Sequence, residues 1–104
     1  MKMLMRMAAL SLVAVMAVPA IAQNDAAALY KSKCQACHGP DGKGDTPAGN
    51  KVGVKDFHSP EVSKMSDQEL AEITKKGKDK MPAYDKKLTD DQIKELITYI
   101  RTLK

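Results

Sequence analysis

The clearest amphipathic pattern lies near the C-terminus. Four apolar residues recur there at the spacing i, i+3, i+4 and i+7: Ile93, Leu96, Ile97 and Ile100. Residues at this spacing lie on one face of a helix, which the protein would bury. Thr89 and Gln92 occupy the two ends of a capping box, which predicts that the helix begins just after Thr89. We expect this helix to lie across the first helix of the chain.

Two earlier helices are predicted from weaker patterns. Ser66 begins a second capping signature, and Gly77 suits the position that follows a helix C-terminus. A first helix would be capped by Asn24 or Asp25 and would continue to the glycine–proline pair at 39 and 40. From there to residue 56 no period is sustained, so we expect a long loop.

Residues 1–22 have the features of an export signal. Lys2 and Arg6 precede an apolar run over residues 8–18, and Ala20-Ile21-Ala22 forms a cleavage site. The run is shorter than the about 20 residues that span a bilayer. We therefore expect cleavage before Gln23, with a retained N-terminal anchor as the alternative.

Cleavage would leave one small domain, residues 23–104, with a thin core. The chain has no tryptophan and one phenylalanine, and its formal charge of +4 would fall to +2 with the signal removed. Domains of this size commonly need disulfides, a metal or a cofactor for stability.

Candidate chemistry is concentrated in Cys34-Gln35-Ala36-Cys37-His38, which contains both cysteines of the chain. On one helical turn, side chains at i and i+3 are neighbours, so both sulfurs would project from the same side. Two such thiols can bond covalently along one edge of a haem, and the following imidazole can ligate its iron. The motif is therefore typical of c-type haem attachment. A buried haem would also supply the apolar mass that the core lacks.

Three other uses of the cysteines are less favoured. A thiol–disulfide enzyme would place them in a βαβ setting, but no strand pattern flanks Cys34. A structural zinc site needs four ligands, and only the distant His58 could complete the set. A disulfide between residues three apart closes too small a loop to gain much entropy.

Met81 is the expected second axial ligand. It precedes Pro82 in a charged loop between two predicted helices, where it has no evident packing role. Met65 would instead contact Leu70 as a hydrophobic staple at the start of the 67–76 helix. His58 could give a bis-histidine haem, but it lies in an irregular polar stretch where an exposed loop residue is the simpler interpretation.

The loop from residue 39 to 56 holds five of the six glycines, and we interpret it as wrapping one face of the haem. Its apolar contacts would be Val52, Val54 and the adjacent Phe57. The carbonyl of Pro47 could accept a hydrogen bond from the second nitrogen of His38, as metal-bound histidines usually require. Alternatively, Pro47 is only a turn residue.

Over residues 24–103 the order of these motifs resembles a small bacterial class I cytochrome c. The resemblance implies an all-α fold in which the N- and C-terminal helices cross and loops wrap one covalently attached haem. Cys34 and Cys37 match the attachment cysteines, and His38 and Met81 match the axial ligands. It leaves the role of Tyr84 open.

The function implied is that of a soluble, periplasmic, monomeric one-electron carrier between redox partners of a respiratory or photosynthetic chain. With both axial positions filled, no site remains for a substrate, so we do not expect an enzyme. The alternative is a haem-based ligand binder or sensor in which the Met81 bond is labile. A thiol–disulfide oxidoreductase is the third interpretation.

Charge is unevenly distributed along the chain. From Lys75 to Lys87, six lysines against two aspartates give +4, whereas residues 56–72 carry −4. Such a dipole would orient the protein toward acidic partner surfaces, although a solvated surface is the alternative. Basic residues do not alternate with aromatic ones as in a nucleic-acid site.

The export signal can be tested on the purified protein. We expect the mature N-terminus to be Gln23, because the cleavage site directly precedes it. Mass spectrometry should detect a chain without residues 1–22. Retention of these residues would contradict a soluble carrier and favour a membrane anchor.

Overall fold

The computed structural model describes residues 23–104, so the expected signal at 1–22 lies outside it. The helices, in chain order, are α1 (Gln23–Lys33), α2 (Gln35–His38), α3 (Pro47–Val52), α4 (Pro60–Ser63), α5 (Asp67–Lys76) and α6 (Asp90–Ile100). The described part of the chain contains no strand, only an isolated bridge between Lys78 and Met81. The all-α prediction is confirmed. Among the described helices, none has the length and apolar character to cross a membrane.

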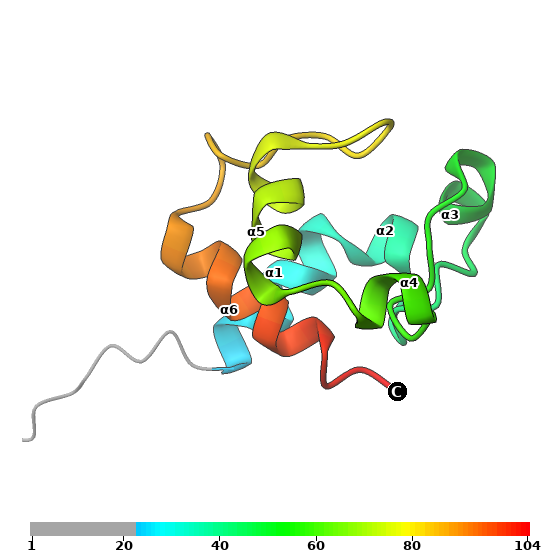
Figure 1. The fold of residues 1–104 in the computed structure, drawn as a ribbon, viewed down its shortest axis with the longest axis horizontal. Helices are drawn as coiled ribbons and strands as arrows, with labels where there is room; N and C mark the ends of the chain where they lie inside the picture. The colour runs from blue at the N-terminus through cyan, green and yellow to red at the C-terminus, as the bar shows by residue number, and fades with distance from the viewer. Residues whose placement is uncertain (1–22) are drawn as a thin grey trace, which may run out of the picture.

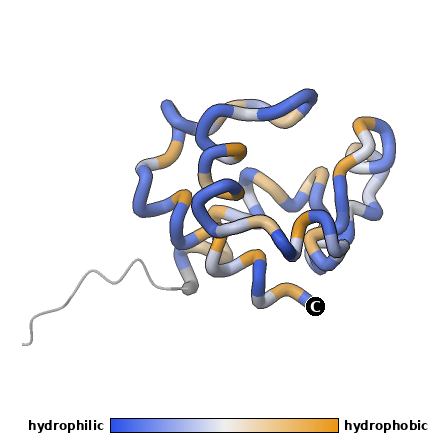
Figure 2. Tube along the Cα trace, viewed as in Figure 1, coloured by the Kyte–Doolittle hydropathy of each residue, from blue (hydrophilic) through white to orange (hydrophobic). Residues whose placement is uncertain are grey.

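The first and last helices pack together, and α5 packs on the same C-terminal helix (Figure 1). The apolar face of α6 is buried as the spacing predicts, and Ile93 is 2% exposed. Tyr30 of α1, 1% exposed, joins this core, together with Leu70 of α5 and Leu88. Figure 2 shows how apolar and polar positions alternate along these helices. The expected contact between the terminal helices is therefore confirmed.

The capping signatures differ in how completely they form. At α6, the Gln92 amide donates to the Thr89 hydroxyl and the Thr89 amide donates to the Gln92 side chain, at 3.1 and 2.8 Å. At α5, the Glu69 amide donates to the Ser66 hydroxyl, but the Glu69 carboxylate accepts from that same hydroxyl instead of from the backbone. The full box is thus present only at α6 among these two helices.

The start of α1 differs from the prediction. Asn24 and Asp25 lie inside the first turn of the helix, which begins at Gln23, so neither residue is its cap. The acidic side chain of Asp25 still suits this end, since a helix N-terminus carries partial positive charge. The first helix also stops at Lys33, because Cys34 leaves helical geometry with φ −121° and ψ −35° before α2 begins.

One short helix, α3, interrupts the loop expected over residues 39–56, and a second, α4, follows that loop. In α3, the Thr46 hydroxyl accepts from the Gly49 amide and Pro47 occupies the first turn. In α4, Ser59 and Pro60 repeat the arrangement. A hydroxyl cap followed by proline is a helix start signal that was present in the sequence, so the prediction of an uninterrupted loop was wrong.

Candidate functional site

The two cysteines lie on one helical turn, as expected: Cys34 separates α1 from α2, and Cys37 is part of α2. The Cys34 amide donates to the Tyr30 carbonyl at 2.9 Å, which continues the hydrogen bonding of α1. The amides of Cys37 and His38 both donate to the Cys34 carbonyl, at 3.2 and 2.9 Å. Both thiols are free and partly buried. The two cysteines therefore lie three residues apart on a hydrogen-bonded turn, and His38 follows directly.

The environment of Cys34 does not suit thiol–disulfide exchange. Burial raises the pKa of its thiol to about 11. Redox enzymes need a lowered thiol pKa, because the thiolate is the nucleophile. The raised pKa of Cys34 argues against a thiol–disulfide enzyme and is compatible with a cysteine whose role is covalent attachment.

The imidazole of His38 stacks on the ring of Phe57. The ring centroids are 4.7 Å apart and the planes meet at 23°. Burial lowers the pKa of His38, which favours the neutral form that binds metals. Its Nδ1 atom is buried and has no hydrogen-bond partner among the described residues, so the expected bond to the Pro47 carbonyl is absent. Pro47 begins α3 instead, whereas the alternative interpretation made it only a turn residue.

Phe57 is itself held by close backbone packing. Its amide donates to the Gly42 carbonyl at 2.9 Å. A Cβ atom at Gly42 would lie 2.6 Å from the Phe57 ring, so only glycine leaves space there. Of the apolar residues expected to contact the haem, Val52 is 37% exposed, whereas Phe57 is partly buried.

The N-terminus of α3 supports the cysteine turn. The Thr46 hydroxyl lies 2.8 Å from the Ala36 carbonyl and 3.1 Å from the Cys37 carbonyl, and it accepts from the Gly49 amide. A Cβ atom at Gly49 would lie 2.2 Å from the Cys37 carbonyl oxygen. Neither residue was predicted to contact the motif, because the loop has no periodicity that relates them to it.

Met81 lies in a tight turn after α5. The Met81 amide donates to the Lys78 carbonyl at 2.9 Å, and the Lys78 amide donates to the Met81 carbonyl at 3.2 Å. Asp79 has a φ of 53°, an uncommon conformation outside glycine. Figure 1 shows this loop, in yellow, extending from the end of α5 above α2 in that view. As an iron ligand, Met81 stays a prediction.

Tyr84 connects the segment after Met81 to the cysteine turn. Its hydroxyl donates to the Lys33 carbonyl at 3.0 Å, across 51 residues of sequence. The pKa of Tyr84 is raised by burial and, to a smaller extent, by the nearby thiols of Cys34 and Cys37. This long-range contact brings the methionine-bearing segment next to the motif, and no local signal in the sequence could have revealed it.

The two alternative iron ligands both have structural roles. His58 is exposed, and its Nε2 atom lies 3.0 Å from the Asp41 carbonyl oxygen. Met65 packs against the core, and its carbonyl accepts from Arg101 at 2.7 Å. That neither residue ligates the iron stays a prediction.

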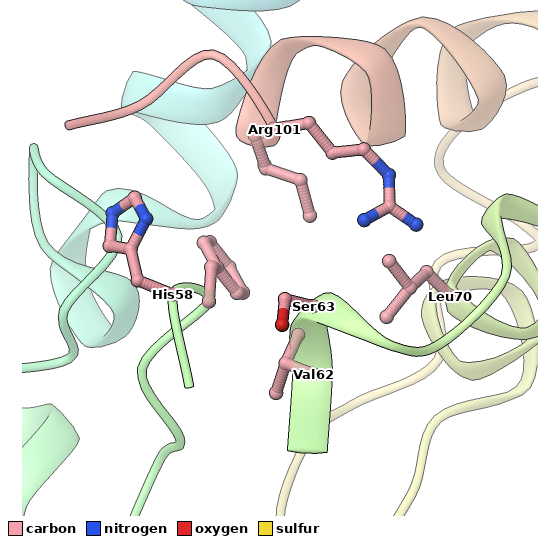
Figure 3. A pocket seen from close by; sticks show the side chains of 7 residues that line it. His58, Val62, Ser63, Leu70 and Arg101 are labelled. Carbon is pink, nitrogen blue, oxygen red and sulfur yellow. The ribbon is translucent and has the colours of Figure 1, made fainter. Parts of the chain in front are cut away.

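Neither of the two clefts described next, both within residues 23–104, is lined by the motif or by Met81. Figure 3 shows a cleft of about 320 Å³ between α4, α5 and the end of α6, where His58, Leu70 and Arg101 are among its lining residues. A second, of about 560 Å³, is lined by residues of α5 together with Met65 and Lys78. Within residues 23–104, no group of three or more His, Cys, Asp or Glu side chains is arranged to hold a metal ion.

Comparison with known proteins decides the family. Residues 22–100 match the family described as cytochrome c oxidase, cbb3-type, subunit III. The chain belongs to this family of c-type cytochromes. Cytochromes of this kind typically carry electrons by means of haem, and the free thiols of Cys34 and Cys37 are consistent with covalent attachment of a haem c.

Solved structures agree with this assignment. The chain is 32% identical to the KustC0563 c-type cytochrome, with a TM-score of 0.67 over 73% of this cytochrome and 93% of that one. A point mutant of the same protein gives 32% identity and a TM-score of 0.69 over 77% and 99%. Cytochrome c6C from Synechococcus sp. PCC 7002, at 24% identity and a TM-score of 0.58 over 76% and 90%, shares the fold. No curated protein sequence matches this cytochrome.

Substitution of Gly49 tests how α3 supports the cysteine turn. We expect Gly49→Ala to lower the free energy of unfolding by about 1–3 kcal/mol, because the added methyl group would overlap the Cys37 carbonyl oxygen. Lys51→Ala in the same helix is the control and should change stability by less than about 0.5 kcal/mol, since its side chain is exposed. Denaturant unfolding of both variants measures this difference. Equal stabilities would contradict the close contact between α2 and α3.

Proposed function

We propose that this cytochrome is an exported one-electron carrier. Cys34 and Cys37 would hold one haem c through thioether bonds, and His38 and Met81 would ligate its iron. The observation that carries the proposal is the single helical turn that presents both free thiols and ends at a half-buried imidazole. This turn lies within a fold shared with other c-type cytochromes.

The protein's own residues have distinct tasks in this function. Stacking on Phe57 restricts the orientation of His38, and burial lowers the pKa of its imidazole, which favours the neutral form that can donate a lone pair. When bound, the haem supplies a one-electron couple between ferric and ferrous iron, and methionine opposite histidine raises its potential. With both His38 and Met81 bound to the iron, no position would remain open for a substrate, which is why we propose a carrier and not an enzyme.

The surface around the Met81 turn is suited to an acidic redox partner. Lys75 forms an ion pair with Asp90 and Lys76 forms one with Glu72. The remaining lysines of this region are exposed and have no ion pair within residues 23–104: Lys78, Lys80, Lys86 and Lys87. We call these four residues the lysine patch. Figure 2 shows hydrophilic colour at the turn of the loop that carries part of it.

The partner class follows from this charge and from the family. The description of the matching family names a subunit of a cytochrome c oxidase, so a terminal oxidase or another component of an electron-transport chain is the proposed type of partner. The export features of residues 1–22 suggest that the carrier works in the periplasm, as a monomer without stable membrane insertion and without nucleic-acid binding.

Replacement of Met81 decides the second axial ligand. In the haem-loaded protein, Met81→Ala should free one iron position, lower the potential and abolish the weak far-red absorbance of a ferric iron–thioether bond. The variant should then bind carbon monoxide or cyanide readily, whereas the parent should resist both. Optical spectra and redox titration of the parent and the variant measure these changes.

Two control variants separate ligation from packing. Met65→Ala should cost only stability, on the order of 1 kcal/mol for a lost staple contact, and leave the iron spectrum unchanged. His58→Ala should have almost no effect on the spectrum. If either control changes the iron spectrum while Met81→Ala preserves it, the ligand assignment is wrong. Free binding of carbon monoxide by the parent would favour the ligand-binding alternative.

Neutralising the lysine patch tests the partner surface. Changing its four lysines to glutamine should slow reduction by an acidic redox partner at low salt, because electrostatic attraction accelerates encounter. Fold and potential should change little, since exposed charges contribute little to stability. The control neutralises four exposed lysines elsewhere: Lys43, Lys51, Lys94 and Lys104. Rates that do not depend on ionic strength, or that fall equally in the control, would identify the patch as ordinary solvated surface.

A further inference from the structure

Tyr84 lies in the segment that follows Met81, and its side chain forms a hydrogen bond with the backbone just before the cysteine turn. Its hydroxyl donates to the carbonyl of Lys33, the last residue of α1, at 3.0 Å. The final carbonyls of a helix have no partner within the helix, so they are available to such a donor. Because Lys33 directly precedes Cys34, this bond fixes Tyr84 beside the point where the cysteine turn begins.

The backbone of Tyr84 is bonded to two other parts of the fold. Its amide donates to the Thr74 carbonyl of α5 at 3.1 Å, and its carbonyl accepts from the amides of Lys87 and Leu88 at 3.0 and 2.9 Å. The Lys87 ammonium lies 5.7 Å from the centre of the Tyr84 ring. Tyr84 therefore connects the end of α1, the last turns of α5 and the approach to α6.

The segment between Gly77 and Tyr84 is a closed turn, so its position depends on its two ends. Two backbone hydrogen bonds join Lys78 and Met81. At Gly77, with φ 77°, a Cβ atom would lie 2.7 Å from the Met81 carbonyl oxygen, which shows how closely the turn folds back on its start. A shift of Tyr84 would therefore move Met81 with the turn as a unit.

We propose that Tyr84 is a positioning residue that sets the Met81 turn against the cysteine turn. Its hydroxyl joins the two segments that carry the proposed attachment and axial residues, and its loss would let the Met81 turn open without unfolding the core. The expected effect on the iron rests on the proposed ligation by Met81. The expected effect on the turn does not depend on that ligation. Segments with few buried contacts open locally at a lower free energy than the core, and one long-range bond can control such opening.

The experiment compares Tyr84→Phe with the parent in the haem-loaded protein. The first measurement is hydrogen exchange at the Met81 amide, which donates within the turn. The second is the rate at which cyanide displaces the second axial ligand of the ferric protein. Both should rise roughly three- to tenfold, the range expected for one lost net hydrogen bond.

Two tyrosines provide matched controls. Tyr30→Phe removes a buried hydroxyl that donates to the Gly39 carbonyl, so it should lower global stability, and exchange at the Met81 amide should rise by no more than this loss of stability predicts. Tyr99→Phe makes the same chemical change on α6, where the ring packs 5.4 Å from that of Tyr30, and it should leave both rates unchanged.

The outcomes separate this inference from the proposed function. Faster exchange and faster cyanide binding in Tyr84→Phe alone support both. Faster exchange with cyanide binding that is rapid already in the parent supports the positioning role and refutes stable Met81 ligation. Unchanged exchange at Met81, or an equal rise in Tyr30→Phe, overturns the positioning role and leaves the ligand assignment to the Met81→Ala experiment.

Discussion

The hydrogen bonding and burial of Tyr30 join the hydrophobic core to the haem-attachment motif. Its ring is 1% exposed and packs against Tyr99 of α6, while its hydroxyl donates to the Gly39 carbonyl just beyond His38. Its own carbonyl accepts from the Cys34 amide. The contact between the terminal helices is thus also what fixes both ends of the cysteine turn. The position of the motif depends on the core, because the four residues of α2 are too few to form a stable helix alone.

The predictable parts of this structure are those specified by neighbours in sequence. The stripe that contains Ile93 and the cap at Thr89 require only local spacing, and both are present as expected. The contacts that build the site are long-range: Gly49 lies against the Cys37 carbonyl, and Tyr84 reaches Lys33 across 51 residues. Periodicity carries no information about such contacts. The helix α3 was missed for a different reason. Its threonine–proline start signal was present in the sequence, but the surrounding glycines favoured the prediction of a loop.

One buried polar atom distinguishes the site from the rest of the fold. The Nδ1 atom of His38 has no partner among the described residues, and an unpaired buried polar group costs about 1–3 kcal/mol. Local rules of polar satisfaction tend to fail at functional sites, where another requirement is met instead. Here the stacking of Phe57, enforced by the absence of a side chain at Gly42, orients the imidazole without a hydrogen bond. For the iron ligation proposed for His38, the packing of an aromatic ring would perform the orienting task that a backbone carbonyl usually performs for metal-bound histidine.

Ion pairing reduces the number of unpaired lysines on the surface that a partner would contact. Composition assigns six lysines to residues 75–87, but the pairs with Asp90 and Glu72 neutralise the two that belong to α5. Such exposed pairs contribute little to stability, so their main effect is on the direction of the electric field. The unpaired positive charge is then confined to the turn that carries Met81 and to the segment just after Tyr84. If these proposals are correct, the side chain that holds the Met81 turn in place also holds the charged surface at a fixed distance from the haem-attachment motif.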